Sequence, residues 1–362
     1  MQPSFDHAAD VLHSYLQEQP PDISAQVCVI HRREIVLDTA GSSPGSSGIT
    51  TDTPFITFSV TKAFTAAAVW HLLDAGKIEL DAPIASYWPE FGQKGKATAT
   101  IRHALLHQAG IPAPHLYSQI LCWPSWRLVT RHVARSQAEF PPGAYSAYHL
   151  VNFGFILGEV VRRVSGMPVD QYLVNTFFVP MGLEHTWMRL PPDKLRLSPR
   201  LQALHPQMRA AAGLFNLPVI RKALIPAAGL HSCARELASF FQMLLADGEC
   251  RGKRYLMPGT IREAARVHYS GYDHFIKTNM NWGLGLIMGG PSPDTPNDSS
   301  SPHGYGSSGI TFSAMGMGTC MVWADRRAEL VTAFTCNGML SDNGTASRWA
   351  LISNAVWDCL QG

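Results

Sequence analysis

Residues 54–62, Pro54-Phe-Ile-Thr-Phe-Ser-Val-Thr-Lys62, change character in mid-run: an apolar, extended entry ends at Ser59 and a helix is predicted from Val60. The helix is predicted over residues 60–75, and the glycine that follows is a typical helix stop. Its apolar side chains recur at helical spacing: Ala63, Phe64, Ala67, Trp70 and Leu73. Ser59 is therefore expected at a helix N-terminus, where backbone N–H groups and the helix dipole favour developing negative charge.

Lys62 follows Ser59 by three residues, so the two side chains are expected on the same side of the helix. A lysine in this place can accept the serine proton if burial keeps its pKa low. The structural alternative is a helix-capping serine beside a solvated lysine. A serine three residues before a lysine also arises easily by chance, so the pair gains weight mainly from its place at the helix start.

A second serine motif competes with the first. Gly41-Ser-Ser-Pro-Gly45 matches G-x-S-x-G, a pattern that requires a sharp turn from a strand into a helix. Here the residues that follow continue as a loop rich in glycine and serine, and no helix is predicted to open. Ser43 is therefore expected to lie in a linker after a hairpin.

Strand patterns occupy the two ends of the chain. Apolar β runs predict hairpins over residues 25–39 and 319–336, and amphipathic helices are predicted over 7–17 and 346–357. Between the ends, residues 64–245 are mostly helical. We therefore expect an α/β (α+β) domain formed by residues 1–75 plus 275–362, an inserted, mostly helical domain over 76–274, and an active site between them.

Composition excludes several classes of protein. Of the 362 residues, 46% are hydrophobic and 15% are charged, which is typical of a folded chain with a buried core. The net charge of +2 and the absence of a long basic run argue against nucleic acid or a membrane as partner. No basic and apolar leader segment opens the chain, so we expect a cytoplasmic protein. The oligomeric state is left open.

Seven dispersed cysteines without a C-x-x-C pair predict free, mostly buried thiols. Among the 15 histidines, His103 and His107 could share a helix face, but no H-E-x-x-H motif is present and no carboxylate completes a zinc set. We therefore expect neither a metal nor another cofactor.

Ser59-x-x-Lys62 on a helix resembles the serine β-lactamase and penicillin-binding-protein superfamily, and within it the class C-like branch that includes the family VIII carboxylesterases. Further segments resemble motifs of that branch in the same order: residues 105–112, Pro142-Gly143 with Tyr148 to Gly154, residues 228–238, residues 282–286 and residues 303–306. The resemblance covers residues 25–340. It implies an antiparallel sheet flanked by N- and C-terminal helices, with a helical insertion.

The resemblance also implies roles for individual residues. Ser59 would be the nucleophile that is acylated, and Lys62 would activate it. Tyr148 would share the general-base work and pass the proton to the leaving group, with the charge of Lys62 favouring the tyrosinate.

Substrate binding would involve the segment His303-Gly-Tyr-Gly306, which stands where the family has K-T-G or H-x-G. The backbone N–H groups of Ser59 and Gly306 would form the oxyanion hole, and Tyr305 stands where glycine is usual. Leu150 replaces an asparagine whose amide binds the acylamino group of β-lactams in the family. His303 replaces a lysine, so the attraction for a lactam carboxylate is weakened.

These features favour a serine ester hydrolase acting on short-chain carboxylic esters through an acyl-enzyme. The alternatives on the same Ser-Lys-Tyr set are a β-lactamase, a D-amino-acid amidase or peptidase, and an acyltransferase. A catalytically inactive binding scaffold is the alternative outside the enzymes.

Overall fold

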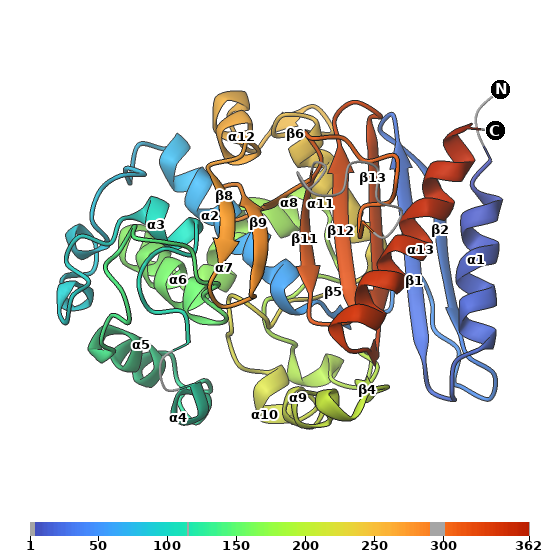
Figure 1. Cartoon of the computed structure of the whole chain (residues 1–362), viewed down its shortest axis with the longest axis horizontal. Coiled ribbons are helices and arrows are strands. Elements are labelled where there is room, and N and C mark those ends of the chain that lie inside the picture. Colours follow the sequence, from blue (N-terminus) through green and yellow to red (C-terminus); the bar gives the residue numbers. More distant parts are fainter. Residues whose placement is uncertain (1–3, 114–115, 290–300, 362) are drawn as a thin grey trace.

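The computed structural model of the chain describes residues 4–113, 116–289 and 301–361. Its largest element is an eight-stranded sheet with the spatial order β2-β1-β13-β12-β11-β10-β9-β8 (Figure 1). Neighbouring strands of this sheet all run antiparallel, which confirms the expected antiparallel sheet. The strands are β1 (Ser24–His31), β2 (Glu34–Ser42), β8 (Tyr269–Asp273), β9 (Thr278–Trp282), β10 (Ile287–Met288), β11 (Phe312–Gly316), β12 (Cys320–Asp325) and β13 (Leu330–Cys336).

The two ends of the chain meet inside this sheet, where β1 lies directly beside β13 (Figure 1). The register runs from Ala25 opposite Cys336 to His31 opposite Leu330. Every residue of both strands is buried, because helices cover both faces of the sheet. The predicted hairpins correspond to β1–β2 and β12–β13.

Helices from the two termini cover one face, which we call the outer face. α1 (Asp6–Gln17) and α13 (Asp342–Gln361) lie side by side on it (Figure 1). Their apolar side chains form one buried cluster with the strand residues that point to this face: Leu12, Leu16, Val27, Val29, Trp323, Phe334, Trp349 and Val356. Both terminal helices are confirmed, and the second is longer than its predicted range of 346–357.

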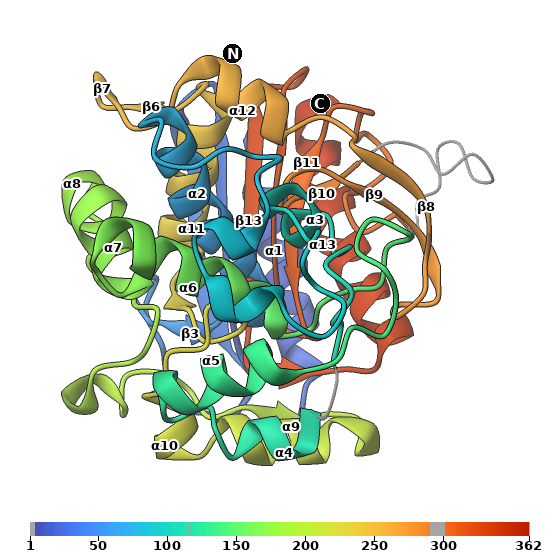
Figure 2. The same ribbon diagram turned by 90° about the vertical axis from the view of Figure 1, so that its left-hand side faces the viewer.

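The opposite, inner face is covered by α11 (Ala234–Leu245) and by the turn of residues 58–60 that leads into α2 (Thr61–Asp74). Figure 2 shows these helices behind those of the helical part. Residues 61–70 of α2 are all buried. The apolar stripe predicted for this helix therefore underestimates its burial: it packs on every side, against the sheet through the turn before it and against the helices α6, α7 and α12.

The remaining helices form the helical part; in Figure 1 most of them lie at the left and bottom, whereas α12 lies at the top. They are α3 (Ile101–Leu105), α4 (Leu116–Ile120), α5 (Trp126–Arg135), α6 (Asn152–Ser165), α7 (Val169–Leu173), α8 (Val179–Met181), α9 (Arg209–Phe215), α10 (Pro218–Arg221) and α12 (Pro258–Ala264). Short two-stranded pairs also occur: β3 (Phe55–Ile56) with β5 (His231–Ser232), β4 (Gln202–Ala203) with β14 (Gly338–Met339), and β6 (Glu249–Cys250) with β7 (Lys253–Arg254).

The division into two domains at residues 75 and 275 stays a prediction. β8 ends at Asp273 and pairs within the main sheet, so the sheet takes in residues just before the predicted boundary. Among the described residues, no helix is both long enough and apolar enough to cross a membrane.

Gly154 in α6 marks the closest packing between the helical part and the segment around Ala227. A Cβ at this position would lie 2.3 Å from the backbone carbon of Pro226. We expect Gly154→Ala to destabilise the fold by about 1–3 kcal/mol, because the backbone of Pro226 and Ala227 would have to move to make room for the methyl group. Thermal or urea unfolding measures the loss.

The matched control for this substitution is Gly213→Ala in α9, where a Cβ would meet no atom within 4 Å. Alanine in an open helical position should stabilise the protein by about 0.5–1 kcal/mol. Equal effects of the two substitutions would contradict the close packing at Gly154.

Candidate active site

Ser59 lies in a tight turn, residues 58–60, that leads directly into α2. Phe58 before it has a φ of 44°, a left-handed conformation that costs energy for a side chain of this size. The turn is held from the segment around Leu230: Thr57 N donates to Leu230 O at 2.8 Å, and Leu230 N donates to Thr61 Oγ1 at 3.0 Å. The hydroxyl of Ser59 thus lies at the start of a 14-residue helix, which is the position expected from the sequence.

Lys62 has three oxygen neighbours and is buried. Its Nζ lies 3.1 Å from Ser59 Oγ, 2.7 Å from the carbonyl oxygen of Leu150 and 3.2 Å from that of Ala227. Burial lowers the pKa of Lys62 well below its usual value, since the cation loses its water and no carboxylate is bonded to it. A neutral amine has two N–H groups for the two carbonyls and one lone pair for the serine hydroxyl, which is the arrangement a general base requires.

Tyr148 completes the group. Its hydroxyl is hydrogen bonded to that of Ser59, and Lys62 Nζ lies 4.6 Å from the centre of its ring. Burial raises the pKa of Tyr148, and the bond with Ser59 only partly offsets this rise. The expectation that Lys62 favours a tyrosinate is therefore corrected: burial dominates the pKa of Tyr148 and raises it, so the protonated phenol is favoured.

Aromatic rings hold the side chain of Tyr148. The rings of His107 and Trp282 lie with centroids 4.5 Å and 5.8 Å from it. Burial lowers the pKa of His107 well below its usual value, and its Nδ1 accepts a hydrogen bond from His149 N at 3.1 Å. His107 is thus a neutral packing partner of the tyrosine, with a structural role that sequence spacing did not indicate.

Leu150 contributes its backbone to the site rather than a side-chain amide. The nearest amide in the sequence, Asn152, is buried and already engaged: it donates to Ile111 O at 2.9 Å and accepts from Gln119 Nε2 at 2.6 Å. This segment therefore offers a substrate no free amide.

The structure contradicts the expected role of residues 303–306. Tyr305 packs in the cluster of the outer face, and a Cβ at Gly306 would lie 2.4 Å from the ring of Trp357 in α13. His303 is buried and bonded to Ser313 Oγ at 2.8 Å, and its carbonyl accepts from the same tryptophan. Ser59 lies on the inner face of the sheet, so His303 and Gly306 do not line its site. The expectation failed because a loop that precedes a strand can pack on either face of the sheet, and residue spacing does not show which face it takes.

The strand beside Ser59 is instead β11, which packs against the turn of residues 58–60. At Gly316 a Cβ would lie 2.3 Å from Thr57 O, so only glycine permits this contact. β10 pairs with β11 only at Phe312 and Ser313, which leaves the rest of that edge unpaired among the described residues. The carbonyl of Thr311 accepts a hydrogen bond from Gly289 N, so the backbone groups of Thr311 point toward β10. Backbone groups of every second residue point to the same side of a strand, so the N–H of Met315 also points to this edge, beyond the part that β10 covers. The paired glycines at 316 and 318 were the available signal in the sequence.

The other serine motif has a structural role. Ser43 Oγ donates to Pro20 O at 2.7 Å and accepts from Ile23 N at 3.2 Å, which fixes the turn after β2. No base is among these partners. The prediction that Ser43 lies in a linker after a hairpin is confirmed.

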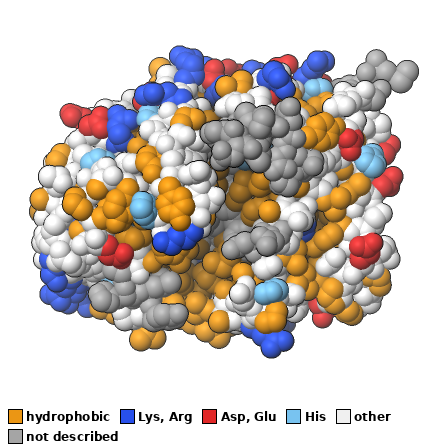
Figure 3. Space-filling model, in the orientation of Figure 1, with side chains coloured by type: hydrophobic (Ala, Val, Ile, Leu, Met, Phe, Trp, Pro, Cys, Tyr) orange, Lys and Arg blue, Asp and Glu red, His pale blue; other side chains and the backbone are white. Residues whose placement is uncertain are grey.

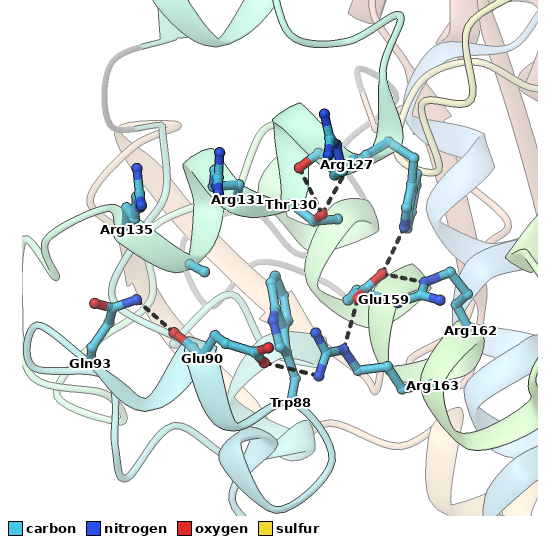
Figure 4. Close-up of a pocket in the computed structure, with 12 residues that line it drawn as sticks. Trp88, Glu90, Gln93, Arg127, Thr130, Arg131, Arg135, Glu159, Arg162 and Arg163 are labelled. Atoms are coloured by element: carbon cyan, nitrogen blue, oxygen red, sulfur yellow. Dashed lines mark hydrogen bonds and ion pairs between the residues drawn. The ribbon is translucent and has the colours of Figure 1, made fainter.

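The surface is hollowed in more than one place. Figure 3 shows that the middle of this face is hollowed between the sheet and the helical part, with hydrophobic side chains along much of the hollow. A separate groove of about 740 Å³ lies between α5 and α6, lined by Trp88, Trp126 and several arginines (Figure 4). In it Glu159 binds Arg162 and Arg163, and its lining includes no part of the Ser59 group.

The seven cysteines are all unpaired, and five of them are buried. In the parts of the chain that the structure describes, no group of three or more His, Cys, Asp or Glu side chains is arranged to hold a metal ion.

Comparison with known proteins gives the following. The family model described as Beta-lactamase matches residues 16–356. Esterase/beta-lactamase LipL from Mycobacterium tuberculosis (strain ATCC 25618 / H37Rv) is 26% identical over 342 residues, 84% of this chain and 73% of LipL. A putative D-alanyl-D-alanine carboxypeptidase from Escherichia coli (strain K12) is 27% identical over 301 residues, 72% of this chain but only 65% of the relative. The crystal structure of a family VIII carboxylesterase aligns with a TM-score of 0.83 at 26% identity, covering 98% of this chain and 97% of that one.

We expect a fluorophosphonate probe to label Ser59, because among the serines that the structure describes only this one has a buried amine bonded to its hydroxyl. Peptide mass mapping locates the adduct. Ser59→Ala should abolish labelling, whereas Ser43→Ala should leave it unchanged. An adduct on the Ser43 peptide would contradict the assignment of the site.

Proposed function

The chain belongs to the Beta-lactamase family, and within this family of serine hydrolases we propose that it cleaves short-chain carboxylic esters through an acyl-enzyme on Ser59. The observation that supports this proposal most directly is the contact of Lys62 Nζ with Ser59 Oγ at 3.1 Å inside a buried site.

Acylation follows from the protonation states of the three side chains. Neutral Lys62 takes the proton of Ser59 as the serine oxygen attacks the ester carbonyl carbon. The tetrahedral intermediate then collapses and the C–O bond to the alcohol breaks. Tyr148 donates its phenolic proton to the departing alkoxide and is reprotonated from Lys62, close to its ring. Water attacks the acyl-enzyme by the same proton path in reverse.

The negative charge on the carbonyl oxygen needs donors on the side of Ser59 that faces β11. We assign these to the backbone N–H groups of Ser59, at the start of α2, and of Met315, on the uncovered edge of β11. This assignment replaces the expected pair of Ser59 and Gly306.

The preference for a neutral ester is supported by what surrounds the site. Leu150 supplies no side-chain amide, Asn152 is engaged elsewhere, and His303 lies on the other face of the sheet, so two groups that hold a β-lactam in related enzymes are missing here. The exposed side chains of Phe275 and Ile276 at the turn between β8 and β9 add an apolar rim near Tyr148. An ester also needs less transition-state stabilisation than an amide.

Three other functions would use the same residues. Similarity to the putative D-alanyl-D-alanine carboxypeptidase of Escherichia coli favours a D-amino-acid peptidase. Similarity to LipL, which is described as an esterase/beta-lactamase, is compatible with a β-lactamase. An acyltransferase would differ only in which acceptor attacks the acyl-enzyme. An inactive scaffold is disfavoured, because the buried amine of Lys62 is bonded to the hydroxyl of a serine at a helix start, an arrangement that binding alone does not require.

Lys62→Ala and Tyr148→Phe should each lower kcat by about 10²-fold or more, because each removes one end of the proton path. The double variant should lose little beyond the worse single variant, since residues acting as a unit are not additive. Steady-state hydrolysis of ethyl butyrate, whose ethoxide leaving group needs the proton of Tyr148, measures these effects.

Lys96→Ala is the matched control, because Lys96 is also buried with its ammonium on backbone carbonyls, those of Gln93, Ala134 and Ser136. It should lower stability but leave kcat per folded molecule within about twofold, well below the factor expected at Lys62. Additive losses at Lys62 and Tyr148 would show that one of the two is only structural.

The value of kcat/KM should be higher for p-nitrophenyl butyrate than for nitrocefin. Leu150→Asn restores an amide worth about 0.5–1.5 kcal/mol, and should raise kcat/KM for nitrocefin roughly 2- to 13-fold. Leu351→Asn, at an exposed position of α13, is the control and should leave kcat/KM unchanged for both substrates. A wild-type enzyme that prefers nitrocefin would overturn the ester proposal.

A further inference from the structure

We propose that Asp273, on β8, is a positioning residue of the active site, and that its carboxylate holds the backbone of Tyr148 so that the phenol can donate its proton to the leaving group. This inference rests on the proposed function and extends it to a residue that lies outside every motif noted in the sequence.

The contacts between Asp273 and the tyrosine segment are direct. Asp273 Oδ1 accepts from Tyr148 N at 3.0 Å, and Oδ2 accepts from Ser146 Oγ at 2.7 Å. The carboxylate and the serine are both fully buried, so these bonds do not compete with water. A charged acceptor in such a place makes hydrogen bonds about twice as strong as those between neutral groups.

The carboxylate is itself fixed by the hairpin that carries it. Oδ1 also accepts from Phe275 N and Ile276 N, each at 3.0 Å, which closes the turn between β8 and β9. His274 N donates to Ser146 O at 2.9 Å, so backbone bonds join the same two segments. The carboxylate of Asp273 thus connects Tyr148 to the turn between β8 and β9. In this turn the ring of Phe275 lies 6.4 Å from the ring of Tyr148.

Residues 136–151 contain no helix or strand, so no regular ladder of backbone bonds fixes Tyr148. The segment stays attached without Asp273 through other bonds, from Ala147 N to His107 O and from Leu150 N to Pro112 O. Loss of the carboxylate should therefore loosen the tyrosine without unfolding the segment. The other groups facing the phenol are Ser59, Lys62 and His107, and the negative charge of Asp273 contributes to its raised pKa.

A second aspartate provides a matched control. Asp325, at the end of β12, is also fully buried, and its Oδ1 accepts from Arg327 N and Ala328 N at 2.9 Å, the same two positions along the chain. Its Oδ2 accepts from Thr311 Oγ1 at 2.6 Å, in place of Ser146. The two carboxylates are built alike, but only Asp273 contacts the tyrosine segment.

The experiment compares two butyrate esters whose leaving groups differ in basicity. p-Nitrophenolate leaves without a proton, whereas ethoxide needs one, so a misplaced proton donor slows the ethyl ester more. We expect Asp273→Asn to lower kcat for ethyl butyrate about tenfold or more and for p-nitrophenyl butyrate about threefold or less, with KM nearly unchanged. Tyr148→Phe should show the same bias toward the ethyl ester, and more strongly.

Asp325→Asn should lower the melting temperature at least as much as Asp273→Asn does. It should, however, lower kcat per folded molecule by the same factor for both esters. The inference is overturned if Asp273→Asn also slows both esters equally, or leaves both unchanged. If the wild type hydrolyses neither ester, the proposed function fails separately. The positioning role is then decided by crystal structures of the variants: Asp273→Asn should displace the phenol of Tyr148 from Ser59, Asp325→Asn should leave it in place, and an unmoved phenol in Asp273→Asn would overturn the inference.

Discussion

The buried amine of Lys62 is the constraint on which the rest of the structure depends. Removing its water costs several kcal/mol unless the proton leaves or other groups replace the solvent. In this chain the lost water is replaced by the carbonyl oxygens of Leu150 and Ala227, which lie 77 residues apart, and by the hydroxyl of Ser59. Because all three must converge on one atom, α2 has to run through the interior, and the helical part and the sheet have to close around its first turn.

This closure depends on backbone meeting backbone. Gly154 lets α6 approach Pro226 and Ala227, and Gly316 lets β11 approach Thr57, at distances that no side chain would allow. Such contacts place the carbonyl at Ala227 and the free edge of β11 with little freedom to shift. The reactive group is therefore positioned mainly by close backbone packing, and the irregular segment around Tyr148 is held by a carboxylate as well.

The electrostatics of the site follow from burial rather than from ion pairs. Lys62, His107 and Tyr148 are all displaced toward their neutral forms by loss of water. A neutral amine beside a protonated phenol is suited to passing one proton back and forth, and it gives little attraction to an anionic substrate. This differs from the expectation of a tyrosinate stabilised by a cationic lysine, and it agrees with the choice of an uncharged ester.

Sequence alone was sufficient to select Ser59, Lys62 and Tyr148, which the structure brings together, and to predict the strands and helices of both termini and the family. These depend on spacing and periodicity within short segments, which the order of residues states directly. Sequence failed for residues 303–306, because a loop beside a strand can lie on either face of the sheet, and here it packs on Trp357 of α13. It also could not show the carbonyls around Lys62, the edge of β11 or the bond from Asp273 to Tyr148. Backbone groups are the same in every residue and carry no signature, so only the tertiary structure decides which of them, from distant segments, meet at one atom.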